Sequence, residues 1–123
     1  MNLSVYEHIP LKDNGIMKSD IIGITISKNN ARIRLTTERW YHIIENHCEL
    51  AGSVFEVLDT VEVPDLIISG ISGELLSLKK INKKYLAVIY RETDKDGFII
   101  TAFWTSDLKQ LLKKRKIIWS KKH

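Results

Sequence analysis

The sequence of 123 residues has a single cysteine, Cys48, so it can form neither an intramolecular disulfide nor a zinc site with several cysteines. It has no Gly-x-Ser-x-Gly motif and no glycine-rich phosphate loop, which argues against a serine hydrolase and a phosphate-loop protein. No apolar run approaches the roughly 18 residues of a membrane span, and the first ten residues lack a signal-peptide pattern. We therefore expect a cytoplasmic protein with no membrane contact and no cofactor.

Length and composition predict one folded domain. Hydrophobic residues make up 44% of the chain, which is enough for one core without covalent staples. Residues 1–20 are the least patterned and predict a loosely ordered N-terminal arm, followed by a single domain over residues 21–123.

The net charge of +4 hides an uneven distribution. Residues 1–78 hold six basic and eleven acidic residues, a net charge of −5, whereas residues 79–123 hold thirteen basic and four acidic residues, a net charge of +9. Clustered lysines gain binding energy when they displace counterions from a phosphate backbone, so this asymmetry indicates a polyanionic partner. A solvated lysine-rich tail would produce the same count.

Apolar periodicity predicts a β-hairpin followed by two helices. Isoleucines alternate with small or polar residues on both sides of the turn signal Lys28-Asn29-Asn30. A helix over residues 37–50 follows, capped by Thr36 or Thr37, with apolar residues at three- and four-residue spacing. The second helix, residues 53–62, begins with the capping-box pattern Ser53-Val54-Phe55-Glu56.

The second half of the chain predicts consecutive strands joined by short turns. The expected strands cover residues 66–70, 75–81, 85–93 and 98–106, with a last strand over residues 116–119. Asp107 can cap a short basic helix before that last strand. Helices segregated from strands predict an α+β fold, with two to three helices on one face of a curved antiparallel sheet of about four to six strands.

The hairpin around Asp94-Lys95-Asp96-Gly97 sets the register of the central strands. If Gly97 forms a left-handed bulge after a type I turn, Arg91 lies opposite Thr101, and both share one face with Thr105. A guanidinium and two hydroxyls on one face could hold a phosphate group. An ordinary β-rich surface is the alternative, because threonine is a good strand residue.

Two histidines lie on the first predicted helix. His42 and His47 are five residues apart, a spacing that points them about 140° apart and argues against a shared metal ion. His47 falls at the edge of the apolar face, where it could be a packed core residue or a catalytic one. Cys48 reads as a small buried hydrophobe.

The order of several short motifs resembles the small toxin and phage-encoded domains of the barnase, EndoU, tRNA-cleaving colicin and RelE assemblage, including relatives such as BrnT. The resemblance covers about residues 31–119, and its motifs are Arg39-Trp40-Tyr41-His42-Ile43, Glu45-Asn46-His47-Cys48-Glu49-Leu50, Pro64-Asp65, Tyr85-Leu86-Ala87-Val88-Ile89-Tyr90-Arg91-Glu92 and Gly97-Phe98-Ile99-Ile100-Thr101-Ala102-Phe103.

This resemblance implies a metal-independent endoribonuclease, the toxin of a toxin–antitoxin pair, that cleaves RNA by 2′-hydroxyl attack and leaves a 2′,3′-cyclic phosphate. It implies that His47, or His42 as second choice, transfers protons, that Arg91 stabilises charge, and that Thr101 and Thr105 contact the phosphate. The expected partners are RNA (mRNA or tRNA) and a cognate antitoxin. The expected RNA-binding residues are Lys79, Lys80, Lys83, Lys84, Trp104, Lys113, Lys114 and Arg115. A non-catalytic nucleic-acid- or partner-binding module with the same basic surface is the alternative.

Overall fold

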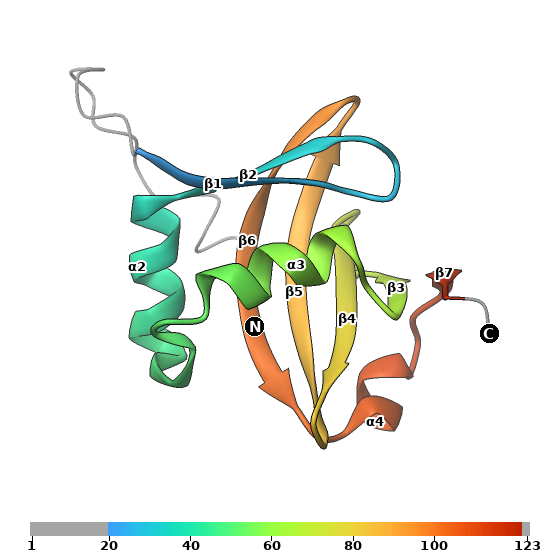
Figure 1. Cartoon of the computed structure of the whole chain (residues 1–123). Helices are drawn as coiled ribbons and strands as arrows, with labels where there is room; N and C mark the ends of the chain where they lie inside the picture. Colours follow the sequence, from blue (N-terminus) through green and yellow to red (C-terminus); the bar gives the residue numbers. More distant parts are fainter. Residues whose placement is uncertain (1–19, 122–123) are drawn as a thin grey trace.

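The computed structural model describes residues 20–121 as one open seven-stranded sheet with three α-helices (Figure 1). The strands follow the order β1-β2-β6-β5-β4-β3-β7 across the sheet. They are β1 (Ile21–Ile26), β2 (Arg32–Thr36), β3 (Leu66–Ser69), β4 (Leu75–Ile81), β5 (Lys84–Thr93), β6 (Asp96–Thr105) and β7 (Ile117–Ser120). The helices are α2 (Thr37–Asn46), α3 (Val54–Glu62) and α4 (Leu108–Leu112), with a 3₁₀ turn, η1 (Cys48–Leu50), after α2. The α+β class is confirmed, but the strand count exceeds the predicted four to six.

The sheet is mixed rather than wholly antiparallel, which corrects the sequence prediction. Residues 32–34 of β2 run parallel to residues 96–98 of β6, while the other neighbouring strands are antiparallel. The Arg34 guanidinium donates to the Asp96 carboxylate at 2.7 Å across this junction. Backbone and Arg34 hydrogen bonds lower the pKa of Asp96. The parallel pair joins segments more than sixty residues apart, a long-range contact that local periodicity does not encode.

In the N-terminal hairpin, β1 buries its polar side, whereas β2 buries its apolar side. Asn30 takes a positive φ of 65° in the predicted turn, and β1 and β2 pair in antiparallel fashion. Thr25 and Ser27 are buried, and the Thr25 hydroxyl donates to the Leu58 carbonyl of α3 at 3.0 Å. The isoleucines of β1 face outward, since Ile24 is 42% exposed.

The two predicted helices form close to their expected bounds. Thr36 caps α2 by accepting a hydrogen bond from the Arg39 amide at 3.2 Å. The capping box predicted for α3 is wrong, because the Ser53 side chain makes no capping hydrogen bond. The helix instead begins with the Val57 amide donating to the Ser53 carbonyl at 3.0 Å, and it ends before Pro64, as expected.

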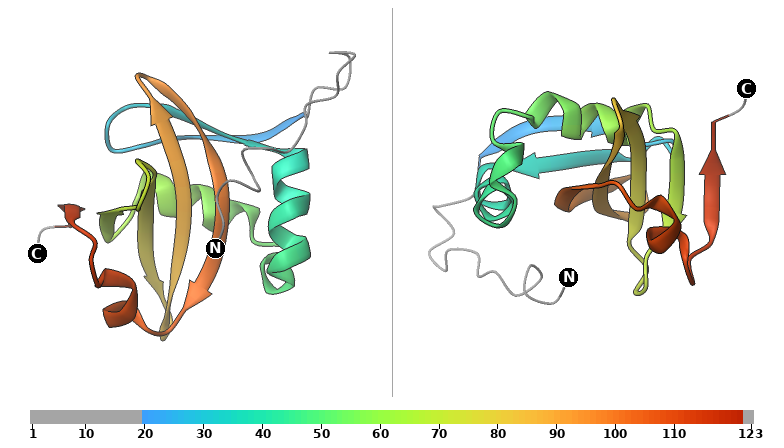
Figure 2. Two further views of the ribbon diagram at one scale, coloured as in Figure 1. Left: turned by 180° about the vertical axis from the view of Figure 1, so that it is seen from behind. Right: turned by 90° about the horizontal axis from the view of Figure 1, so that it is seen from below.

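The sheet separates two apolar clusters. On one side, α2 and α3 cover a larger cluster, and α3 crosses in front of the central strands (Figure 1). On the other side, residues of α4 pack against a smaller cluster, and α4 is the described helix seen on that side in the rear and lower views (Figure 2). We name these sides the α3 face and the α4 face. The buried members are Ala31, Ile33, Leu35, Trp40, Ile43, Leu50, Val57, Val61, Leu86, Val88, Tyr90, Ile99 and Ala102 on the α3 face, and Ile68, Leu76, Leu78, Ala87, Ile89 and Ile100 on the α4 face.

The register predicted for the last hairpin is wrong. Thr93 pairs with Asp96 around a two-residue turn, so Arg91 lies opposite Phe98 rather than Thr101. Asp94, not Gly97, adopts the positive φ, at 63°. Gly97 is instead required by close packing, because a Cβ there would collide with the Arg91 carbonyl oxygen.

A bulge in β6 then moves the pairing again. Ile89 lies opposite Thr101 and Tyr90 opposite Ile99, which leaves Ile100 as the extra residue. Ile100 therefore joins the α4-face cluster. Thr101 still shares a face with Ile89, because the pairing there differs from the prediction by two residues and a two-residue shift preserves the facing of side chains.

The C-terminal segment follows its prediction. Asp107 caps α4 by accepting from the Gln110 amide at 3.0 Å, and β7 pairs with β3 at the sheet edge. Apart from Asp20, the expected N-terminal arm lies outside the described residues. Across residues 20–121, every helix is too short or too polar to cross a membrane.

Candidate functional site

A pocket of about 320 Å³ opens on the α4 face. His47 and Arg115 provide its ionisable groups, and Phe103 provides an aromatic wall. Three aliphatic residues, Leu76, Ile89 and Leu111, complete the lining. Flat apolar walls beside two groups able to carry positive charge suit an anionic ligand with an aromatic part.

His47 reaches this pocket because α2 ends there. Its backbone amide donates the last helical hydrogen bond, to the Ile43 carbonyl at 2.8 Å, and the chain then turns into η1. The imidazole ring lies 6.1 Å from the Phe103 ring, centroid to centroid, at an interplanar angle of 36°. Nδ1 is 3.9 Å from a carboxylate oxygen of Glu49. The histidine is thus held between an aromatic ring and a carboxylate while its side chain stays 30% exposed.

Arg115 comes from the other end of the chain. Its guanidinium donates to the Leu111 carbonyl of α4 at 2.9 Å, and its Nε is buried without a hydrogen-bond partner among the described residues. Arg115 also lines a neighbouring cavity of about 480 Å³, whose other lining residues include Lys113 and Lys114. The two cavities therefore meet at the Arg115 guanidinium, with Lys113 and Lys114 on one side of it and His47 on the other.

Sequence reasoning placed Arg115 among the RNA-binding residues and did not pair it with His47. The signal for that pairing was present in the spacing of Leu108, Leu111 and Leu112, which pack α4 onto the sheet. A helix docked in this way carries the next residues of the chain to the same face.

The predicted phosphate contacts are only partly brought together. Thr101 shares the α4 face with the pocket residues Ile89 and Phe103, but it is fully buried, and its hydroxyl has no hydrogen-bond partner within the described residues. The Thr105 hydroxyl accepts from the Asp107 amide at 3.1 Å, next to the cap of α4. Arg91 is on the same side of β5 as Ile89, yet it does not line the pocket, and it donates to the Ser72 carbonyl at 3.1 Å.

His42, the second-choice histidine, does not line the pocket either. Its Nδ1 lies 3.7 Å from a carboxylate oxygen of Glu45 on the outer surface of α2. Of the two histidines on the first helix, His47 is therefore the one that the fold carries to a cavity.

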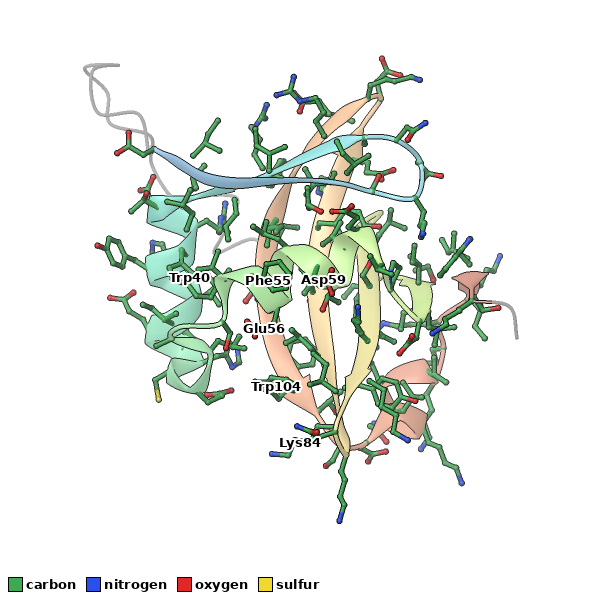
Figure 3. All side chains as sticks on the ribbon, in the orientation of Figure 1. Trp40, Phe55, Glu56, Asp59, Lys84 and Trp104 are labelled. Atoms are coloured by element: carbon green, nitrogen blue, oxygen red, sulfur yellow. The ribbon has the colours of Figure 1, made fainter. Side chains whose placement is uncertain are left out.

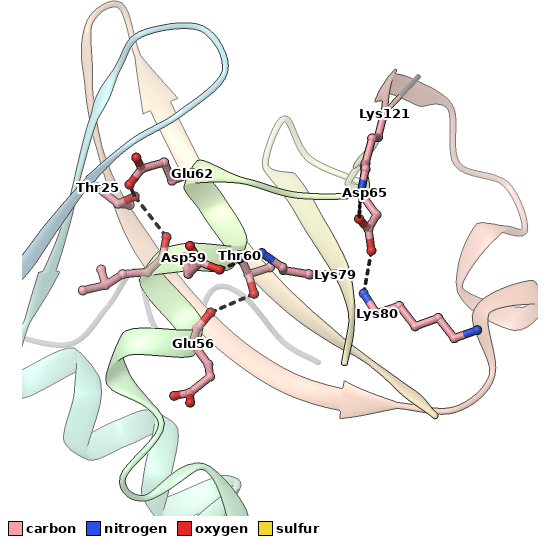
Figure 4. A network of polar contacts seen from close by, with 10 residues as sticks. Thr25, Glu56, Asp59, Thr60, Glu62, Asp65, Lys79, Lys80 and Lys121 are labelled. Carbon is pink, nitrogen blue, oxygen red and sulfur yellow. Dashed lines mark hydrogen bonds and ion pairs between the residues drawn. The ribbon is translucent and has the colours of Figure 1, made fainter. Parts of the chain in front are cut away.

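Two of the predicted RNA-binding lysines form hydrogen bonds to acidic residues, Lys79 through its side chain and Lys80 through its backbone amide. The Lys79 ammonium donates to the Asp59 carboxylate at 2.6 Å, against α3 and away from the pocket (Figure 4). The Lys80 backbone amide donates to the Asp65 carboxylate at 2.8 Å, while its side chain extends into solvent (Figure 4).

The remaining predicted lysines and Trp104 occupy other surfaces. Lys113 and Lys114 adjoin Arg115, as described above. Lys83, Lys84 and Trp104 line a separate cavity of about 650 Å³ at the β4–β5 turn. Trp104 packs with the α3-face cluster, so this cavity lies on the other side of the sheet from the His47 pocket.

Within residues 20–121, no group of three or more His, Cys, Asp or Glu side chains is arranged to hold a metal ion. Cys48, expected to be buried, is exposed. Comparisons with protein-family models, with curated proteins and with solved structures found no match. The functional argument therefore depends on the chemistry of the pocket and of its surroundings.

Proposed function

We propose that the protein is a metal-independent endoribonuclease whose site is the pocket between His47 and Arg115. The observation that carries the proposal is the convergence of these two residues on one pocket beside Phe103. An imidazole transfers protons near neutral pH, and a guanidinium stabilises charge on phosphate oxygens. The aromatic wall can stack a nucleobase, and Lys113 and Lys114 next to Arg115 extend the positive surface along a nucleic-acid strand.

The reaction proceeds by attack of a ribose 2′-hydroxyl on the adjacent phosphorus. His47 removes the hydroxyl proton, the 2′ oxygen bonds to phosphorus, and the bond from phosphorus to the 5′ oxygen breaks. The leaving 5′ oxygen takes a proton from water, and the hydroxide that this forms takes the proton held by His47, which restores the neutral imidazole. Arg115 remains protonated and neutralises the nonbridging oxygens, whose charge rises in the transition state. The products are a 2′,3′-cyclic phosphate and a 5′-hydroxyl. The proposal includes a toxin role, with a cognate antitoxin that covers the pocket between His47 and Arg115.

Cleavage of single-stranded RNA in EDTA, read by end-group analysis of the fragments, tests this assignment. We expect H47A and R115A each to lower kcat/KM by about 10²-fold, the usual scale for losing a proton-transfer group or a charge-stabilising donor. E45A is the matched control, because the Glu45 side chain is 72% exposed near the end of α2, two residues before His47, and does not line the pocket.

H42A and R91A separate this assignment from the one implied by the sequence resemblance. Loss of cleavage in R91A with full activity in R115A would make Arg91 the charge-stabilising residue. Tight RNA binding by the wild type with no cleavage of any transcript would favour a non-catalytic binding module, which the largely aliphatic lining of the pocket also suits.

A further inference from the structure

The cavity at the β4–β5 turn has a different composition from the His47 pocket. It measures about 650 Å³ and is lined by Glu49, Ile81, Asn82, Lys83, Lys84 and Trp104. Figure 3 shows Trp104 and Lys84 below α3, at the end of the sheet where β4 turns into β5. Trp104 is half-buried, so its indole both packs on the core and borders the cavity.

The charged groups of this cavity come from two separate elements. Lys83 lies in the β4–β5 turn, and Lys84 is the first residue of β5. Both side chains are exposed, and neither forms an ion pair with any described residue. Glu49 belongs to η1 and carries the one carboxylate of the lining. An anionic group in the cavity is therefore attracted to the turn and repelled from η1.

We propose that this cavity binds one nucleotide of single-stranded RNA, with its base stacked on Trp104 and its phosphate held by Lys83 and Lys84. An aromatic plane with adjacent ammonium groups is how proteins hold unpaired nucleotides, because every base has a π-face and every nucleotide a phosphate. The Glu49 carboxylate orients the nucleotide by keeping its phosphate at the turn. The choice of RNA rests on the proposed ribonuclease function.

The two cavities adjoin through one side-chain pair. Glu49 lines the Trp104 cavity, His47 lines the pocket on the α4 face, and the two side chains are 3.9 Å apart. β6 pairs with β2 only over residues 96–98, so the rest of its edge carries no second strand, and α2 and η1 lie along that side. In this proposal the substrate strand passes from one cavity to the other beside the His47–Glu49 pair, with the scissile phosphate at His47 and a flanking nucleotide at Trp104.

Binding of a fluorescent 2′-O-methyl hexanucleotide in EDTA tests the site independently of cleavage, because this ligand has no free 2′-hydroxyl to attack. We expect W104A to raise Kd about tenfold, within the range measured for the loss of one base–aromatic stack. W104F keeps an aromatic ring and should bind close to wild type, which separates loss of stacking from loss of folding. The double variant K83A/K84A should weaken binding and reduce the salt dependence, lowering the slope of log K against log salt by about 0.7, the value for one phosphate of a single strand.

K95A is the matched lysine control, because Lys95 is exposed in the β5–β6 turn, at the opposite end of β5 from Lys84. Wild-type affinity in both W104A and K83A/K84A would overturn the nucleotide site, as would a failure of the wild type to bind. If the hexanucleotide binds with the expected variant pattern but no RNA is cleaved, the nucleotide site stands and the ribonuclease proposal fails. If RNA is cleaved with the same KM by wild type, W104A and K83A/K84A, the ribonuclease proposal stands and the nucleotide site fails.

Discussion

The α3 face and the α4 face of the sheet differ in how completely they are covered. α2 and α3 together cover most of the α3 face, where Leu35, Ile43 and Val57 have no exposed surface, and the Trp104 cavity opens only at its end by the β4–β5 turn. On the α4 face, one helix of five residues packs against the cluster, and its leucines stay partly exposed. The pocket with His47 and Arg115 lies on this second face.

This difference indicates that the two faces of the sheet contribute unequally to stability. Buried apolar area is the main stabilising contribution to a fold, so most of the stability should come from the α3 face. A short helix leaves room beside it for a ligand, and the groups that border that room are cationic or titratable. The predictions below test whether the α3 face contributes more to stability than the α4 face.

The largest expected effect on stability is on the α3 face. Leu35→Ala should lower the free energy of unfolding by about 2–5 kcal/mol, because it leaves a cavity in a fully buried site. Leu111→Ala, in the partly exposed α4, should cost about 2 kcal/mol or less. Urea denaturation followed by circular dichroism measures both. Equal losses in the two variants would contradict the division between the faces.

The β3–β4 turn should show the next largest effect, and its stability should depend on pH. Glu74 is 3% exposed, and its carboxylate accepts from the Ile71 amide and from the amide and hydroxyl of Ser72. Burial alone would raise the pKa of Glu74, but these hydrogen bonds and one from its own amide lower it below the ordinary 4.5. E74Q should therefore cost about 1–2 kcal/mol at pH 7.

The sign of the pH dependence follows from that lowered pKa. The contribution of Glu74 is fully present above pH 4.5, the unfolded-state value, and is lost as the pH falls through the folded-state value. The difference in the free energy of unfolding between wild type and E74Q should therefore be smaller at pH 3 than at pH 7. A difference that persists unchanged at pH 3 would show that Glu74 acts by packing rather than by ionisation.

A smaller effect is expected at the ion pair between α3 and β4. Asp59 and Lys79 are 2.6 Å apart, with side chains 31% and 25% exposed. A double-mutant cycle with D59N and K79M should give a coupling of about 0.2–1 kcal/mol that declines with salt, because solvent screens a partly exposed pair. K79M should leave RNA affinity unchanged, in contrast to K83A/K84A. Loss of RNA affinity in K79M would restore Lys79 to the binding surface that the sequence predicted.

Local patterns predicted most of the elements, whereas contacts between distant segments did not follow from the sequence. The caps of α2 and α4 and the order of strands 66–105 were readable because each depends on neighbouring residues. Alternation in β1 predicted a strand but not that its polar side would be buried, because that depends on α3 lying over Thr25.

The candidate site was less predictable than the fold, for a related reason. The pairing of Arg91 with Thr101 depended on one turn type, and the Asp94 turn and the bulge at Ile100 changed the register twice. The position of His47 at the edge of the apolar face of the first helix could be predicted, because it depends on local spacing. Its approach to Arg115 depends on the docking of α4, some sixty residues later in the chain.

An effect of similar size to that of the Asp59–Lys79 pair belongs to a contact outside both apolar clusters. The Lys28 ammonium lies 5.0 Å from the centroid of the Trp119 ring, which joins the β1–β2 turn to β7 at the far edge of the sheet. K28M keeps the apolar stem and removes the charge, and it should cost about 0.5–1 kcal/mol, the usual value of an exposed cation–π contact. Pairing K28M with W119L in a double-mutant cycle isolates the contact from the packing of each side chain. A coupling near zero would mean that the two edges of the sheet contribute independently to stability. The α3 face would then stabilise the fold without help from the Lys28–Trp119 contact.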